Sequence, residues 1–182
     1  LTNAQQIITE EVSGLRRMVD NFSNFARLPQ PDPKVRNLSN ICAHVVELQK
    51  NAFPQHEITF ENSEETLNAK VDEDLIRQVV LNLIKNAAEA CGETPSKIAV
   101  SVSDVGSACF IKIKDNGPGV PEELKTRIFE AYFTTKHTGP TAGMGLGLAV
   151  CQKIVLDHGG KMSVKSVPGD TTFTISLPKK VG

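Results

Sequence analysis

Apolar residues recur at alternating intervals of four and three along the first part of the chain. They fall at Ile8, Val12, Leu15, Val19, Phe22 and Ala26. This spacing is typical of a helix that buries a narrow seam against partner helices. We therefore predict that residues 1–28 form one helix of a helical bundle. The alternative is an amphipathic helix that lies on the chain's own globular domain.

Three prolines interrupt the helical pattern after residue 28. Pro29, Pro31 and Pro33 each push the residue before them out of the α-helical region, so this stretch cannot continue the helix. We expect residues 29–37 to be a linker. Residues 38–180 are expected to form one globular domain, which is long enough to bury a full hydrophobic core.

The hydrophobic pattern of the globular part predicts a mixture of helices and strands. Helices are expected over about residues 38–52, 72–91 and 146–158, with Asp72 capping the second and Gly159-Gly160 ending the third. Strands are expected over about residues 57–61, 68–71, 98–103, 108–114, 161–166 and 172–177, and a short helix after Pro121. Because strands and helices do not alternate regularly, we predict an α+β fold with helices on one face of a mostly antiparallel sheet.

Composition narrows the classes of function. A net charge of −1 gives no reason to expect nucleic acid or an anionic membrane as a partner, and the low aromatic content does not favour a platform for stacking bases. No apolar run approaches the roughly 18–20 residues that a membrane span needs. Cys42, Cys91, Cys109 and Cys151 lack the paired spacing of a zinc site, and we expect buried free thiols in a reducing compartment. Because the chain begins at Leu1, we expect a fragment of a longer protein.

Three polar residues share one stripe of the predicted helix 72–91. Asn82, Asn86 and Glu89 fall within about 60° of one another when each residue advances the helix by about 100°. They lie beside an apolar face formed by Ile76, Val79, Val80, Leu83 and Ala87. Two amide oxygens and a carboxylate suit a hard cation that keeps several waters. The alternative is a solvated polar edge.

A second polar motif follows directly after the predicted strand 108–114. Asp115 lies at the strand end, where its carboxylate can accept a hydrogen bond from an exocyclic amine. Gly117 and Gly119 lack a side chain and would let a flat ring approach the backbone. The alternative is an ordinary Asn-Gly turn.

A glycine-rich stretch precedes the predicted helix 146–158. Glycines at three alternate positions, in residues 143–148, would present backbone N–H groups and a positive helix end to phosphate. The stretch matches neither the Rossmann fingerprint nor a Walker A loop. Before it, Phe133 would anchor a lid over residues 134–145, and Lys136 would reach a terminal phosphate. The alternative is a loop without a ligand.

The order of these motifs resembles a known family. Asn-x3-Asn-Ala, Asp-x-Gly-x-Gly, Phe-Glu-x-x-Phe-Thr-Thr-Lys and Gly-x-Gly-Leu-Gly-Leu closely resemble the N, G1, F and G2 boxes of the ATP-binding domain of sensor histidine kinases. The resemblance implies a two-layer Bergerat-type fold, shared with gyrase, mismatch-repair and chaperone ATPases. Asn-Ala-x-Glu-Ala, Phe-Thr-Thr-Lys and residues 18–27 are similar to the nitrogen-regulation branch. Residues 166–173 resemble the closing box, with Asp170 where a glycine is usual.

The resemblance implies Mg-ATP as the cofactor and assigns roles to the motif residues. Asn86 is expected to bind Mg²⁺ with Asn82 supporting it, and Asp115 to accept from the adenine amine. Asn82 and Lys136 are the candidate catalytic residues. The remaining candidate nucleotide-binding residues are Lys85, Glu89, Gly117, Gly119, Phe133, Thr135, Gly143, Met144, Gly145, Leu146 and Gly147.

The acceptor of the phosphoryl group is not expected within this fragment. The family transfers the γ-phosphoryl group of ATP to a histidine of a dimerisation hairpin, whose second helix residues 1–28 resemble. None of His44, His56, His137 and His158 is followed by the family's acid-Arg/Leu-x-Asn-Pro pattern. We expect homodimerisation through the hairpin and transfer to a response regulator. The fragment is expected in the cytoplasm, and the full-length protein at the bacterial inner membrane.

Two rival functions are weighed against phosphoryl transfer. ATP hydrolases of the superfamily carry a glutamate four residues before the metal-binding asparagine, as the base that activates water. Here that position is Asn82, a poor base, which favours transfer to an acceptor that supplies its own nucleophile. A non-enzymatic scaffold that responds to nucleotide is the second rival, and the motifs alone leave it open.

Overall fold

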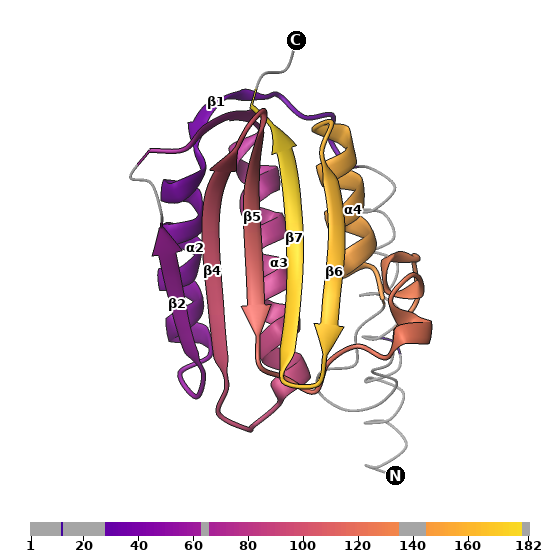
Figure 1. The fold of residues 1–182 in the computed structure, drawn as a ribbon. Coiled ribbons are helices and arrows are strands. Elements are labelled where there is room, and N and C mark those ends of the chain that lie inside the picture. The colour runs from indigo at the N-terminus through magenta and orange to yellow at the C-terminus, as the bar shows by residue number, and fades with distance from the viewer. Residues whose placement is uncertain (1–11, 13–27, 63–65, 135–144, 180–182) are drawn as a thin grey trace.

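Two layers make up the domain, a β-sheet and a row of helices on one of its faces (Figure 1). The computed structural model describes residues 12, 28–62, 66–134 and 145–179. Except for residues 12 and 28, the predicted bundle helix lies outside these ranges. No helix within the described ranges is both long and apolar enough to cross a membrane.

The main sheet has five strands in the order β2-β4-β5-β7-β6. Their bounds are β2 Glu57–Asn62, β4 Lys97–Val105, β5 Ala108–Asp115, β6 Lys161–Val167 and β7 Asp170–Pro178. All neighbouring pairs are antiparallel except β2 and β4, which run parallel. The predicted α+β fold with a mostly antiparallel sheet is therefore confirmed.

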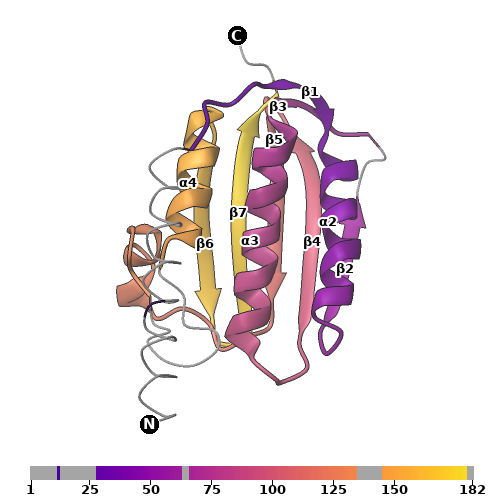
Figure 2. The ribbon, with the colours of Figure 1, turned by 180° about the vertical axis from the view of Figure 1, so that it is seen from behind.

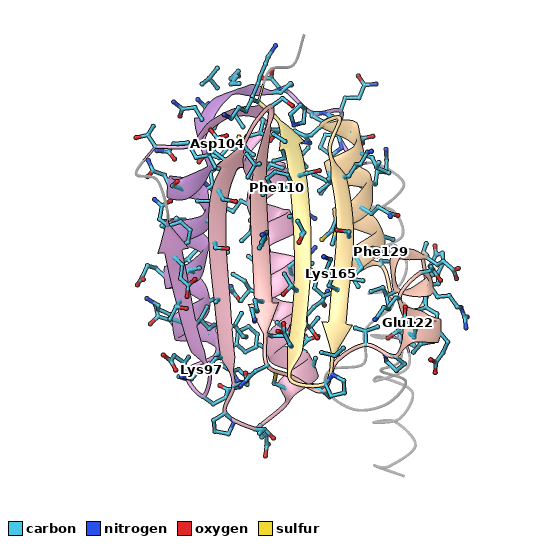
Figure 3. All side chains as sticks on the ribbon, in the orientation of Figure 1. Lys97, Asp104, Phe110, Glu122, Phe129 and Lys165 are labelled. Atoms are coloured by element: carbon cyan, nitrogen blue, oxygen red, sulfur yellow. The ribbon has the colours of Figure 1, made fainter. Side chains whose placement is uncertain are left out.

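Alternation along the strands separates a buried face from an open one. On β5, Cys109, Ile111 and Ile113 are buried, whereas Lys112 and Lys114 are exposed. Figure 3 looks onto the open face, on which no helix of the described chain lies, and marks Phe110 on β5 and Lys165 on β6. The apolar positions of each strand thus face the helices and form the core.

The helical layer consists of α2 Leu38–Ala52, α3 Glu73–Cys91 and α4 Gly147–Asp157 (Figure 2). α3 lies at the centre, where its apolar stripe is buried. Asp72 caps α3 as predicted, because its carboxylate accepts from the backbone N–H groups of Asp74 and Leu75 at 3.1 and 3.3 Å. This cap satisfies two backbone N–H groups of the first turn, which have no partner within the helix.

A second, two-stranded sheet corrects the predicted linker. Residues 34–37, which the sequence placed in the linker, form β1 Lys34–Asn37 and pair antiparallel with β3 Asn68–Val71. Asn37 also caps α2, since its side chain accepts from the N–H groups of Ser39 and Asn40. Only residues 28–33 of the described chain lack helix and strand there. Residues 34–37 are thus paired with the globular part rather than free of it.

The segment after Pro121 forms two short 3-10 turns rather than one helix. They are η1 Glu122–Leu124 and η2 Arg127–Phe129, beside α4. The ring of Phe129 meets the ring of Phe173 edge to face at 6.4 Å between centroids. This contact fixes the turns against the sheet.

Candidate functional site

Three elements carry the predicted site residues. β5 and α3 run toward the lower end of Figure 1, and α4 begins at about the middle of the domain's height and runs upward (Figures 1 and 2). Asp115 is the last residue of β5, and Gly147 is the first residue of α4. Motifs that are far apart in the sequence therefore lie in the part of the domain between its middle and its lower end in Figure 1.

Asp115 is a buried acid with an unpaired oxygen. The residue is only 4% exposed, and its Oδ1 accepts a hydrogen bond from the N–H of Gly117 at 2.9 Å. Its Oδ2 accepts no hydrogen bond from the residues that the structure describes. Among these residues, the fully buried side-chain atoms without a partner are His56 Nε2 and Arg77 Nε, so Oδ2 keeps access to solvent. Burial raises the pKa of the Asp115 carboxyl, although the Gly117 hydrogen bond lowers it, and the charge of Asp170 adds to the rise. The free oxygen is suited to accept from a ligand amine.

Gly117 and Gly119 are required for close packing within this turn. A Cβ on Gly117 would lie 2.8 Å from Asp115 Oδ1 and 2.9 Å from Cys91 Sγ. Gly119 has φ of +86°, and a Cβ there would lie 2.9 Å from backbone atoms of Val167 and Pro168. Both glycines were predicted to let a ligand approach the backbone. In the structure, protein atoms already account for both of them.

Sequence reasoning missed a buried polar pair beside Asp115. Thr171 is the partner of Asp115 across β5 and β7, and it is 3% exposed. Its Oγ1 lies 2.7 Å from Oγ of Ser166, which accepts from the N–H of Val120 at 2.8 Å. A signal was present, because Thr171 occupies the same alternate positions as the buried Phe173, Ile175 and Leu177. A hydroxyl on the core side of a strand indicates a polar site.

Asp170, which stands where the family's closing box usually has a glycine, lies at the surface. Its Oδ2 pairs with Nζ of Lys114 at 3.0 Å, and both side chains are more than half exposed. The acid thus lies outside the core and reaches the site only through its charge, which raises the pKa of Asp115.

The polar stripe of α3 lies beside the core, as predicted. Asn82, Asn86 and Glu89 are all half-buried. Asn82 interacts with the Cys151 thiol on α4. Burial raises the pKa of this thiol to about 12, and the hydrogen bond with Asn82 opposes that rise. Lys85 Nζ lies 3.7 Å from Oε1 of Glu89, so these two charges partly neutralise each other. Asn82 is therefore held between α3 and α4, and Asn86 follows one helical turn later.

The residues that the structure describes contain no group of three or more His, Cys, Asp or Glu side chains that could hold a metal ion. A Mg²⁺ ion bound by one amide oxygen, phosphate oxygens and waters does not need such a group. The half-buried amide of Asn86 is compatible with that kind of site.

The first turn of α4 has no side-chain cap. Leu146 precedes the helix, is 6% exposed and cannot accept a hydrogen bond through its side chain. A Cβ on Gly147 would meet no atom within 4 Å, so the backbone is open there. Uncapped N–H groups at the start of an α-helix favour an anion.

The two ends of the predicted lid lie against each other. The N–H of Tyr132 donates to the carbonyl of Gly145 at 3.0 Å, and Gly145 packs on the backbone of Phe133. The guanidinium of Arg127 lies 4.5 Å from the centre of the Phe133 ring. Thr135, Lys136, Gly143 and Met144, which the sequence placed in the site, lie outside the described residues.

Two hollows of the described surface lie away from these residues. Both are lined by Arg36, Glu73 and Arg77, near β1 and the start of α3. Glu73 pairs with Arg36 Nε at 3.1 Å and with Arg77 Nη2 at 2.6 Å. Neither hollow contains a predicted nucleotide residue, and their charges are largely paired within the protein.

Comparisons with known proteins agree with the motif order. Residues 71–181 match the family model described as "Histidine kinase-, DNA gyrase B-, and HSP90-like ATPase". The chain is 37% identical over 180 residues to the nitrogen regulation protein NtrY of Azorhizobium caulinodans, an alignment that covers 95% of the chain but 23% of that relative. The chain thus spans less than a quarter of the length of this curated relative.

Solved structures with a related sequence have the same fold. The catalytic domain of histidine kinase ThkA is 34% identical, with a TM-score of 0.74 over 81% of this chain and 96% of that one. ThkA in complex with the response regulator TrrA is 31% identical, with a TM-score of 0.78 over 96% of this chain and 50% of that one. The chain therefore belongs to the histidine kinase-, DNA gyrase B- and HSP90-like ATPases, and its catalytic domain is of the sensor histidine kinase type.

Proposed function

We propose that this domain binds Mg-ATP and donates the γ-phosphoryl group to a histidine of a separate helical hairpin. The observation that carries the proposal is the carboxyl of Asp115, which is 4% exposed and keeps one oxygen without a protein partner in the described chain. That oxygen keeps access to solvent, so an otherwise buried carboxyl presents one free acceptor to a ligand that donates a hydrogen bond. The exocyclic amine of adenine is such a donor.

The phosphates of ATP would extend from Asp115 toward the start of α4. There the uncapped N–H groups after Leu146 and the open backbone at Gly147 would bind phosphate oxygens. Asn86 would hold Mg²⁺, which would neutralise charge that develops on the phosphates during transfer. Lys136 is proposed to contact the terminal phosphate as a point charge.

The acceptor is proposed to be a histidine outside the described domain. His56 is buried beside Ser96, and its Nδ1 lies 2.8 Å from the Ser96 hydroxyl. His158 is also buried, with Nδ1 at 2.7 Å from the carbonyl of Ile154 and Nε2 accepting from the N–H of Asp72. Both imidazoles therefore serve the fold. Neither offers an accessible nitrogen to a phosphoryl group. His44 is exposed on α2, but it lacks the family's acceptor pattern.

The full protein would act as a homodimer through its hairpin and pass the phosphoryl group to an aspartate of a response regulator. A structural neighbour, ThkA, was solved in complex with a response regulator, which supports this partner class. We further propose that the domain works in the cytoplasm and that the full-length protein is anchored in the bacterial inner membrane.

A reconstituted transfer reaction tests the proposal. The protein is mixed with Mg-ATP labelled at the γ-phosphate and with a separately made hairpin that carries the acceptor histidine. We expect acid-labile label on the hairpin, and none on a control hairpin in which glutamine replaces that histidine. ATP binding without transfer to the hairpin would instead support a nucleotide-responsive scaffold.

ATP turnover in the absence of any hairpin separates transfer from hydrolysis. We expect no turnover above background, because Asn82 is a poor base for activating water. Rapid turnover that is lost in Asn82→Ala would show a hydrolase and would contradict the proposed transfer.

A further inference from the structure

Cys91 differs from the other cysteines in its exposure. It is the last residue of α3 and is half-buried, whereas Cys42, Cys109 and Cys151 are buried. Burial also raises the pKa of the Cys42 and Cys151 thiols to about 12, so these two are poor nucleophiles at neutral pH. A thiol reagent should therefore distinguish Cys91 from the rest.

The Cys91 thiol also lies against the turn that holds Asp115. Its Sγ and Asp115 Oδ1 both lie within 3 Å of the position that a Cβ on Gly117 would take, at 2.9 and 2.8 Å. The two side chains thus flank the same glycine from different elements, α3 and β5. An atom added to Sγ must be accommodated close to this carboxyl.

Asp115 gives an independent reason to place a ligand at this point. Its carboxyl is 4% exposed, yet Oδ2 has no hydrogen-bond partner among the described residues. This oxygen keeps access to solvent, so it presents a free acceptor to a ligand that donates a hydrogen bond. If that ligand is adenine, Cys91 lies beside the base.

We propose that Cys91 is a covalent modification site on the wall of the nucleotide site, and that an adduct on its sulfur excludes the nucleotide. The inference rests on the proposed function, because it takes the adenine of ATP to be the partner of Asp115. The modifying agents are soft electrophiles and activated disulfides, which react with accessible thiols.

Two reagents make the chemistry explicit. N-ethylmaleimide adds the Cys91 sulfur across its carbon–carbon double bond, with the thiol proton transferred to the neighbouring carbon, so nothing leaves. Methyl methanethiosulfonate instead exchanges: a sulfur–sulfur bond forms to its S-methyl group, methanesulfinate leaves with the electron pair, and the thiol proton goes to solvent. Dithiothreitol reverses only the second reaction, by reducing the disulfide.

Mass spectrometry of the folded protein tests the site. We expect N-ethylmaleimide to label the peptide that contains Cys91 first, with the peptides of Cys42, Cys109 and Cys151 as internal controls. Saturating Mg-ADP should slow labelling of Cys91 at least about tenfold, since bound base would cover the sulfur. Equal labelling with and without bound Mg-ADP would overturn the proposed position of Cys91.

Calorimetric titration with Mg-ADP tests whether an adduct on Cys91 weakens nucleotide binding. We expect the methanethiosulfonate adduct to bind at least about tenfold more weakly, a loss of about 1.4 kcal/mol, and dithiothreitol to restore binding. For Cys91→Ser, treated and untreated samples should bind alike, whatever the affinity of the untreated variant. Weakening of the treated Cys91→Ser variant would place the effect at another thiol and overturn the proposal.

The outcomes separate this inference from the proposed function. If the untreated protein does not bind Mg-ADP or Mg-ATP, the proposed function fails, and this inference fails with it. If the untreated protein binds and a stoichiometric Cys91 adduct binds equally well, only this inference fails. A thermal unfolding curve of the adduct that matches the untreated protein, followed by recovery in dithiothreitol, would show that lost binding is not unfolding.

Discussion

The carboxyl of Asp115 lies in an environment that disfavours its charge. Burial raises its pKa, and the nearby charge of Asp170 adds to the rise, while the hydrogen bond from Gly117 opposes it. A carboxyl with a raised pKa in the folded state binds a proton more tightly there than in the unfolded chain. Its contribution to stability is therefore present below the ordinary carboxyl pKa, of about 3.9, and is lost as pH rises through the raised value.

Replacing Asp115 tests its role in nucleotide binding separately from its role in stability. In Asp115→Asn, the side-chain oxygen can still accept from Gly117, but the second atom becomes a donor that faces the adenine amine. We expect Mg-ADP affinity to fall at least about tenfold, by calorimetry. The free energy of unfolding in urea at neutral pH should not fall, because the variant carries no buried charge. A large loss of stability would show that the ionised carboxylate supports the fold.

Asn86 offers a second test at the residue scale. Asn86→Ala removes the proposed amide ligand of Mg²⁺ from a half-buried position on α3. We expect no measurable Mg-ATP binding in calorimetry, with a circular dichroism spectrum like that of the parent protein. Gln78→Ala is a matched control, since Gln78 carries an amide on an exposed part of the same helix. Unchanged affinity in Asn86→Ala would contradict the metal assignment.

At the scale of elements, the junction between residues 132 and 145 is closely packed and strained. Tyr132 has φ of +67°, and it is the one non-glycine residue with positive φ in the described ranges. Gly145 has φ of +66°, and a Cβ there would lie 2.3 Å from the carbonyl oxygen of Phe133. Strained backbone of this kind persists only where the surroundings hold it, and it is frequent at functional sites.

Gly145→Ala should disrupt this junction. The new Cβ would collide with the backbone of Phe133, which cannot move aside as a flexible side chain would. We expect a loss of stability of about 1–3 kcal/mol in urea unfolding and weaker nucleotide binding. For stability alone, Gly147→Ala is the control, because its Cβ meets nothing within 4 Å. Equal free energies of unfolding for the two variants would show that the junction accommodates a Cβ at residue 145 without loss of stability.

At the scale of the whole molecule, β1 decides where the domain begins. β1 pairs with β3, Arg36 forms an ion pair with Glu73 of α3, and Asn37 caps α2. A chain of residues 34–182 keeps all three features, and a chain of residues 38–182 loses them. We expect the shorter chain to be less stable by at least about 1 kcal/mol, the typical value of a helix cap, in urea unfolding. Equal stability would assign β1 to the linker after all.

Much of the fold was predictable because its signals are local. The start of α3 follows from Asp72 and the apolar spacing behind it, and the bounds of α2 and α3 agree with the prediction within one residue. The strands were recognisable from alternation within each segment, as in β5. Helix caps and periodicity act over a few neighbouring residues, so the sequence alone contains them.

Only part of the predicted site can be compared with the structure. The motif order led to the family, and it placed Asp115 and Asn86 on the elements where the structure has them. The ligand roles of these residues remain predictions. Residues 135–144 of the lid lie outside the described chain. The role of Lys136 therefore rests on the sequence pattern and the resemblance, and that of Thr135 on the resemblance alone.

By itself, the sequence determined the elements, the order of the motifs and the family they indicate, because short-range spacing and residue type suffice for each. Only the tertiary structure decided that β1 pairs with β3, that Thr171 lies opposite Asp115, and that Cys91 adjoins Gly117. These contacts join segments far apart in the chain, and their pairing depends on how the layers pack rather than on local pattern. Asp115 was recognised as a strand-end acid, but its burial and its unpaired oxygen emerged from packing alone.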